Sequence, residues 1–241
     1  MSNTEEVKEE LKYELTAETK VNIFGVTLFR IRATVSFKDV KQGDLGGWVS
    51  GDARVYGDAW VYGDAQVYGN ARVYGDARVY GDAQVYGNAR VYGDARVYGN
   101  ARVYGDAQVY GDARVYGDAR VYGNAQVSGD ARVYGDAWVY GNARVYGNAR
   151  VYGDAQVYGN ARVYGDAWEE SPLQIQGTRH FVNVCSKFTL RIGCKEFSFT
   201  KWKKVFKEVG ADQSYTETQI KEYGLYIDLA IAIYGEGDTE D

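Results

Sequence analysis

Arginine and tyrosine are the side chains in this chain of 241 residues whose chemistry and spacing together favour a binding surface. From Val49 to Trp168 the sequence repeats one six-residue unit, Val-Tyr-Gly-(Asp/Asn)-Ala-(Arg/Gln/Trp), twenty times without an insertion. Eighteen of the twenty units carry Tyr after Val, and the exceptions are Ser50 and Ser128. Guanidinium groups bind anions and clustered surface aromatics mark contact sites, so the repeats indicate binding rather than a reaction.

Catalytic and metal-binding side chains are scarce and lie outside the repeats. The single histidine, His180, is the one imidazole available as a general base. With Cys185 and Cys194 it gives the spacing His-x4-Cys-x8-Cys, which matches no strong zinc pattern and lacks a fourth ligand. The Gly-Asp corners offer too few kinds of oxygen donor for a calcium site. We therefore expect no catalytic residue, no metal and no cofactor, but a hydrogen-bonded histidine and buried thiols.

The repeat unit itself predicts one short strand followed by one corner. Ala and Val stand two residues apart and point to one side of an extended segment, whereas Arg and Tyr point to the other side. Gly followed by Asp or Asn then supplies the bend, because these residues tolerate unusual backbone dihedrals. An amphipathic strand of this kind buries Ala and Val and exposes Arg and Tyr.

Sorting the variable positions at multiples of eighteen residues predicts three distinct faces. Five of the seven Asn in the repeats fall in one corner row, and all the repeat Gln fall in two of the three rows that precede Val. We therefore predict a three-sided parallel β-solenoid of about six and two-thirds coils, on the order of 30 Å long. The remaining row contains no Gln and gives the candidate ligand-binding residues Arg78, Arg96, Arg114, Arg132 and Arg150, flanked by Trp60 and Trp168.

Five stacked arginines repel one another by about 1 kcal/mol per neighbouring pair even in water. Aspartates at the adjacent corners or an anionic partner would relieve this repulsion. In the alternative interpretation the Tyr and Arg ladders have only a structural role, because stacked rings and guanidinium groups also stabilise neighbouring strands without a ligand.

The segments that flank the repeats predict caps, because the end coils of a solenoid expose a thin Val and Ala core. We expect a flexible acidic N-terminus at 1–10, an N-terminal β cap at 11–48, the solenoid at 49–168, a C-terminal α+β cap or oligomerisation unit at 169–236, and an acidic tail at 237–241. Residues 173–198 predict three short strands. Helices follow, one that begins near Thr200 and ends at Gly210 and one at about 216–234.

The chain resembles the hexapeptide-repeat, left-handed parallel β-helix proteins, and more narrowly their phage- and prophage-encoded members. The resemblance rests on the lead-in segment from Lys38 to Val49, on the tandem Val-Tyr-Gly-Asn-Ala-Arg units, and on the segment from Ser171 to His180. It implies a left-handed coil, which the spacing alone does not decide. The best-known activity of this family, acyl transfer with a histidine base on a coil, is not expected because the repeats contain no histidine.

Composition favours a cytoplasmic protein, or one in the host cell cytoplasm if it is phage-encoded. The N-terminal sequence lacks the regions of a signal peptide, and no stretch is apolar enough to predict a membrane partner. Two cysteines form no framework of disulfides. A net charge of −5 argues against general nucleic-acid binding.

The leading hypothesis is a non-catalytic binding or scaffold protein that forms homo-oligomers and presents Tyr and Arg ladders to a host protein or an anionic small molecule such as a nucleotide. The phage resemblance implies that it inhibits or sequesters a host defence component or nucleotide signal. The alternatives are a structural virion or filament component and a hexapeptide acyltransferase.

Overall fold

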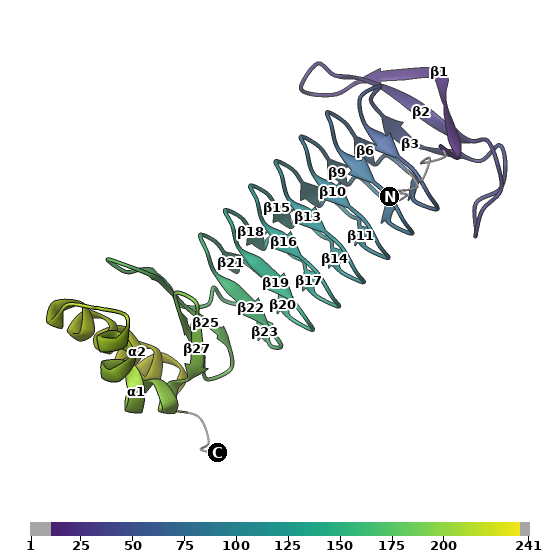
Figure 1. The fold of residues 1–241 in the computed structure, drawn as a ribbon. Coiled ribbons are helices and arrows are strands. Elements are labelled where there is room, and N and C mark those ends of the chain that lie inside the picture. Colours follow the sequence, from purple (N-terminus) through teal and green to yellow (C-terminus); the bar gives the residue numbers. More distant parts are fainter. Residues whose placement is uncertain (1–10, 237–241) are drawn as a thin grey trace, which may run out of the picture.

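A computed structural model describes residues 11–236 as a rod with a different cap at each end (Figure 1). The predicted acidic segments 1–10 and 237–241 lie outside the described residues. The rod is a parallel β-solenoid, so the protein is mainly β, as predicted. No helix within 11–236 has the length and apolarity to cross a membrane.

Three sheets form the faces of the solenoid, and we call them faces 1, 2 and 3. Face 1 contains β1 (Tyr13–Val21), β2 (Thr27–Ala33), β3 (Leu45–Val49), β6 (Gln66–Val67), β9 (Gln84–Val85), β12 (Arg102–Val103), β15 (Arg120–Val121), β18 (Trp138–Val139) and β21 (Gln156–Val157). Face 2 contains β4 (Arg54–Val55), β7 (Arg72–Val73), β10 (Arg90–Val91), β13 (Gln108–Val109), β16 (Gln126–Val127), β19 (Arg144–Tyr146) and β22 (Arg162–Tyr164). Face 3 contains β5 (Trp60–Val61), β8 (Arg78–Val79), β11 (Arg96–Val97), β14 (Arg114–Val115), β17 (Arg132–Val133), β20 (Arg150–Val151) and β23 (Ala167–Trp168).

Residues eighteen apart lie one above another, which confirms the three-sided prediction. Arg96 pairs with Arg114 in a parallel register, and the Arg96 backbone N–H donates to the Ala113 carbonyl at 2.9 Å. The same bond recurs from coil to coil. Each strand is only two or three residues long within the repeats, so its stability comes from the neighbouring coils.

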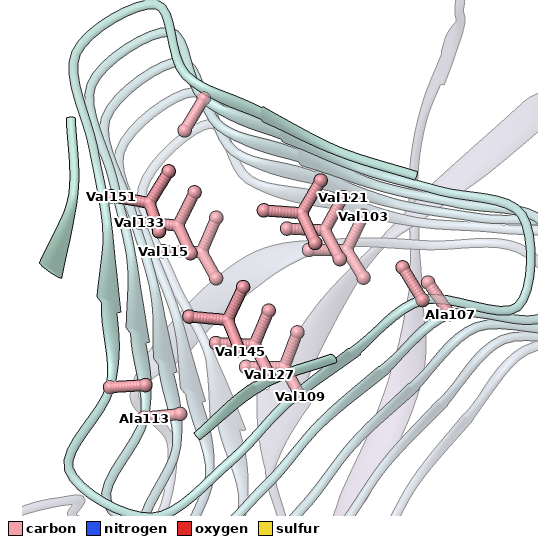
Figure 2. Packing of buried hydrophobic residues seen from close by; sticks show 14 of the residues in the cluster. Val103, Ala107, Val109, Ala113, Val115, Val121, Val127, Val133, Val145 and Val151 are labelled. Atoms are coloured by element: carbon pink, nitrogen blue, oxygen red, sulfur yellow. The ribbon is translucent and has the colours of Figure 1, made fainter. Parts of the chain in front are cut away.

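Valine and alanine fill the interior of the rod. Every repeat Ala and Val from Ala65 to Val163 is completely buried. Burial of one valine side chain stabilises a fold by roughly 1.5–3 kcal/mol, and the repeats multiply this contribution along the axis. Figure 2 shows one column of valines for each face, labelled Val103 and Val121 for face 1, Val109, Val127 and Val145 for face 2, and Val115, Val133 and Val151 for face 3.

Glycine at the corners is required for two reasons that Gly99 illustrates. Its φ of 69° lies in the left-handed region, which side chains with a Cβ rarely adopt. A Cβ at Gly99 would also lie 3.0 Å from the backbone nitrogen of Gly117 in the next coil. The corner therefore fixes both the bend and the close stacking of coils.

The N-terminal cap continues face 1 directly. Strand β1 pairs antiparallel with β2, and β2 pairs antiparallel with β3. Trp48 in β3 then lies beside Gln66 in a parallel pair, so the cap runs directly into the solenoid.

The C-terminal cap is a four-stranded antiparallel sheet followed by two helices. The sheet contains four strands where three were predicted, namely β24 (Gln174–Gln176), β25 (Phe181–Ser186), β26 (Thr189–Ile192) and β27 (Lys195–Ser198). Helix α1 (Phe199–Asp212) begins one residue before Thr200, close to the predicted start, and its N-cap is Ser198, whose hydroxyl accepts the Lys201 N–H. Helix α2 (Glu217–Tyr234) has Thr216 as its N-cap, in agreement with the sequence pattern.

Candidate binding surface

Two parallel ladders of side chains cover the outside of each face. One ladder holds the residue before each valine, and the other holds the tyrosine after it. Tyr98 and Tyr116, for example, stack with ring centroids 4.8 Å apart and planes 2° apart. This spacing is that of the strands, so the backbone of the solenoid sets the geometry of both ladders.

Face 3 carries the predicted arginine row, and the structure places Arg78, Arg96, Arg114, Arg132 and Arg150 in register along it. Beside them runs an unbroken tyrosine ladder with centroid spacings of 4.8–5.1 Å, made of Tyr62, Tyr80, Tyr98, Tyr116, Tyr134 and Tyr152. The matching row on face 1 mixes Gln, Arg and Trp. Face 3 is therefore the face on which both ladders are uniform.

The arginines of face 3 are not neutralised by the corner aspartates. Arg78 pairs with Asp39 of the N-terminal cap at 3.0 Å. Among the described residues, no carboxylate lies within 4.0 Å of Arg96, Arg114, Arg132 or Arg150. The corner aspartates therefore do not relieve the mutual repulsion of these four arginines.

Trp60 lies in the arginine row but is not available to a ligand. It pairs in register with Arg78, yet only 7 % of its surface is exposed. The ring of Phe37 packs edge-on against it at 5.6 Å. Trp60 therefore anchors the N-terminal cap to face 3.

Trp168 does not belong to the arginine row, and this part of the prediction is wrong. The register slips by one residue in the last coil, so Ala167 lies beside Arg150 and Trp168 lies beside Val151. A slip of one residue turns each side chain to the opposite side of a strand. Trp168 consequently takes the inward position of a valine and is 7 % exposed, where it covers the open end of the core.

Burial raises the pKa of the phenols of Tyr62, Tyr80, Tyr98 and Tyr116 on face 3, so these groups stay protonated at neutral pH and can donate hydrogen bonds. Burial raises the pKa of Tyr116, and the neighbouring phenols of Tyr98 and Tyr134 raise it further. The guanidinium groups of Arg132 and Arg114 oppose this shift. A ligand on this face would meet cationic and neutral donors side by side.

Face 2 differs from face 3 because its tyrosine ladder is interrupted at Ser128. A cavity of about 360 Å³ lies at this position, between the rings of Tyr110 and Tyr146. Arg144 and Arg162 also border it. The sequence shows the serine, but the cavity follows only from the rings above and below it.

A second polar cavity, of about 350 Å³, lies where face 2 meets the C-terminal cap. Its lining includes four arginines, of which Arg144 and Arg162 come from the repeats and Arg179 and Arg191 from the cap, together with His180. Arg179 and Arg191 lie outside the repeats in the sequence and follow no period. No pattern in the sequence could have joined them to the other two.

The two cysteines occupy different environments, and neither forms a disulfide. Cys185 is buried in β25, as predicted, whereas Cys194 is exposed, which corrects the expectation of two buried thiols. The His180 ring contacts the Tyr215 ring with centroids 5.7 Å apart and planes tilted by 39°. Its backbone N–H donates to the Tyr223 hydroxyl. Within 11–236, His180 and the cysteines do not form a cluster of three metal-ligating groups.

The repeats match one family model, described as the YdcK beta solenoid repeat. The matched segments are residues 49–63, 65–81, 83–97, 95–111, 107–123, 125–141, 137–153, 143–156 and 155–171. A search of curated proteins found no match to the chain.

Proposed function

We propose a non-catalytic binding function for this chain, whose repeat region belongs to the YdcK β-solenoid repeat family. In this proposal face 3 presents its arginine and tyrosine ladders to an anionic ligand or to an acidic protein surface. The supporting observation is the set of four stacked arginines, Arg96 to Arg150, that have no carboxylate partner among the described residues. A bound anion would remove the repulsion that the fold leaves in place.

The repeated geometry favours an extended partner over a single small ion. Equivalent guanidinium groups recur at the strand spacing, and neutral phenols accompany them along the same line. Several weak contacts of this kind add up when they are presented on one rigid scaffold. We expect face 3 to bind either another copy of this chain in a homo-oligomer or a host protein through several such contacts.

The proposed partner class follows from the resemblance to phage-encoded solenoids. On that basis we propose that the protein inhibits or sequesters a host defence component or a nucleotide signal in the cytoplasm. A filament component is less favoured, because caps cover both ends of the rod (Figure 1). An acyltransferase is less favoured because the coils carry no histidine.

The test compares the wild-type protein with two triple variants. The first variant carries Arg96→Gln, Arg114→Gln and Arg132→Gln on face 3. The second carries Arg54→Gln, Arg72→Gln and Arg90→Gln on face 2 as a matched control of equal charge. Both should fold, because Gln108 and Gln126 already occupy equivalent positions.

Native mass spectrometry of each protein, purified from its host, reports the assembly state and any bound partner. We expect the wild type and the face 2 variant to retain a partner or assembly that the face 3 variant loses, with thermal unfolding unchanged. Retention by the face 3 variant, or equal loss from both variants, would contradict the proposal.

A further inference from the structure

The two serines that replace tyrosine in the repeats lie in opposite environments. Ser50 is 4 % exposed and directly follows Val49, which pairs with Phe29 of the N-terminal cap. Its small size is therefore explained by the cap. Ser128 lies in the middle of face 2, lines an open cavity and has no cap above it. Packing does not explain the missing ring at Ser128.

The gap that Ser128 leaves in the tyrosine ladder has the thickness of one aromatic ring. On this face Tyr74, Tyr92 and Tyr110 stack at 4.8–5.0 Å per coil. Tyr110 and Tyr146 are two coils apart, so twice this spacing separates the levels of the two rings. A planar ring inserted between them would take the place of the absent phenol and stack on both sides. Ser128 leaves the required volume and a hydroxyl.

The cavity continues toward a concentration of positive charge. Arg144 and Arg162 line both the notch at Ser128 and the polar cavity beneath the C-terminal cap. Along a strand, two residues span about 7 Å, which is the distance between the tyrosine ladder and the arginine ladder of one face. A ring in the notch would thus hold an attached anionic group near Arg144 and Arg162.

The two cap arginines are held in place before any ligand arrives. The Arg191 guanidinium donates to the Asn160 carbonyl at 3.1 Å. The Arg179 guanidinium donates to the Ser214 carbonyl at 2.9 Å and lies over the ring of Tyr215. These contacts use some of the N–H groups of each guanidinium and leave the other N–H donors for a ligand. Such preorganised donors bind anions without first losing side-chain freedom.

No carboxylate in the described part of the chain forms an ion pair with any of these four arginines. Glu196 lies opposite Arg191 in the β26–β27 pair, where its charge raises the pKa of Arg191, and its carboxylate accepts a hydrogen bond from the Tyr164 hydroxyl. Burial lowers the pKa of Arg191, and the charge of Arg162 lowers it further. An anion at this position would offset both effects.

We propose that the notch at Ser128 and the arginine cavity form one binding site for a planar aromatic ring that carries a phosphate or other anionic group. The ring stacks between Tyr110 and Tyr146, and the anion is bound by the four arginines. A nucleotide and a phosphorylated tyrosine both have this chemistry. This site lies on face 2, so it goes beyond the function proposed for face 3.

Calorimetric titration with ADP and with O-phosphotyrosine tests the site and distinguishes the two sources of the ring. Adenosine and pyrophosphate serve as probes that supply only the ring or only the anion. We expect ADP, O-phosphotyrosine or both to bind at least about tenfold more tightly than either partial probe, because stacking and charge act together. Failure of both complete ligands to bind in the millimolar range would overturn the proposal.

Ser128→Tyr is the decisive variant, because it restores the ladder found in the other coils and fills the notch. We expect it to fold at least as well as the wild type and to weaken binding of the complete ligand about tenfold or more. Arg144→Gln with Arg162→Gln should weaken binding of the ligand and of pyrophosphate. Arg54→Gln with Arg72→Gln, at the other end of the same ladder, should change neither. Undiminished binding by Ser128→Tyr would overturn the ring site, whereas the outcome for the face 3 variants has no bearing on it.

Discussion

The two ends of the solenoid expose the same kind of sheet edge and close it with different groups. At the N-terminal end, backbone strands continue face 1, since β2 pairs with β3. At the C-terminal end, side-chain amides take the place of a further strand. An unpaired edge invites pairing with another chain, so both ends need closure. The difference shows that a repeat can be ended either by more backbone or by a few polar side chains.

Asn183 and Gln174 provide the side-chain closure. The Asn183 amide donates to the Arg162 carbonyl at 2.7 Å and accepts from the Arg162 N–H at 3.3 Å. The Gln174 amide accepts from the Tyr158 N–H at 2.7 Å and donates to the Gln156 carbonyl at 2.8 Å. A carboxamide carries the same donor and acceptor as a peptide group, so one side chain pairs with a strand edge as a strand would.

Removal of the buried Asn183 amide should lower the free energy of unfolding more than any other change proposed here. Asn183 is completely buried, so Asn183→Ala leaves the N–H and carbonyl of Arg162 without partners and without water. We expect the free energy of unfolding to fall by about 2–4 kcal/mol. Denaturant unfolding followed by circular dichroism measures the change.

Gln174→Ala is the matched control, because it removes the same kind of pairing at a half-buried position. Water can replace the lost bonds there, and we expect a loss of less than about 1 kcal/mol. Equal losses for the two variants would show that burial of the amide does not matter and that the C-terminal closure is not specific.

The next prediction concerns alkaline pH, to which the C-terminal end should respond through Cys185. Burial raises the pKa of this thiol to about 12, and the charge of Glu196 contributes to the shift. The folded state thus prefers the protonated thiol. The stabilisation is complete below the unfolded-state pKa of about 8.5 and is lost as pH rises toward 12.

Comparison of wild type with Cys185→Ala isolates this effect, since the tyrosines titrate in both proteins. Between pH 9 and pH 11 the wild type should lose about 2–3 kcal/mol more than the variant. Labelling with a thiol reagent at pH 8 gives an independent check, in which exposed Cys194 reacts and Cys185 stays protected until unfolding. A pH dependence equal in the two proteins would contradict the assignment.

The regular part of the fold could be predicted from the sequence because each repeat position has one neighbour above and one below. The period of eighteen fixed the faces and placed Arg78 to Arg150 in one row. The prediction failed for Trp168, although the spacing continues to that residue. Burial of a large ring over the open core outweighs one more ladder position, and the backbone slips to allow it.

The non-periodic parts could be predicted only as caps. The cavity that joins Arg179 and Arg191 to Arg144 and Arg162 depends on how the cap sheet docks on the last coils, and no local pattern encodes that docking. Ser128 was visible as an exception to the repeat. Its consequence required the positions of the flanking rings, which a sequence does not contain.

The smallest expected effect concerns the ion pairs at the N-terminal end. Lys12, Lys20 and Lys38 of the cap pair with the corner aspartates Asp58, Asp64 and Asp76. All three pairs are partly exposed, so each contributes roughly 0.2–1 kcal/mol. Replacement of the three lysines by Gln should therefore lower the free energy of unfolding by about 1–2 kcal/mol at low salt.

Salt separates the two kinds of closure, because it screens exposed charges and leaves neutral hydrogen bonds almost unchanged. In 1 M NaCl the difference between wild type and the lysine variant should shrink toward zero. The loss caused by Asn183→Ala should stay the same under these conditions. Lys203→Gln, which removes an ion pair between α1 and α2, controls for loss of a lysine away from the sheet edges. If salt leaves the effect of the lysine variant unchanged, the lysine side chains stabilise the cap by packing of their methylene groups and by cation–π contact, such as that of the Lys20 ammonium 4.3 Å from the Trp48 ring, and not by the ion pairs.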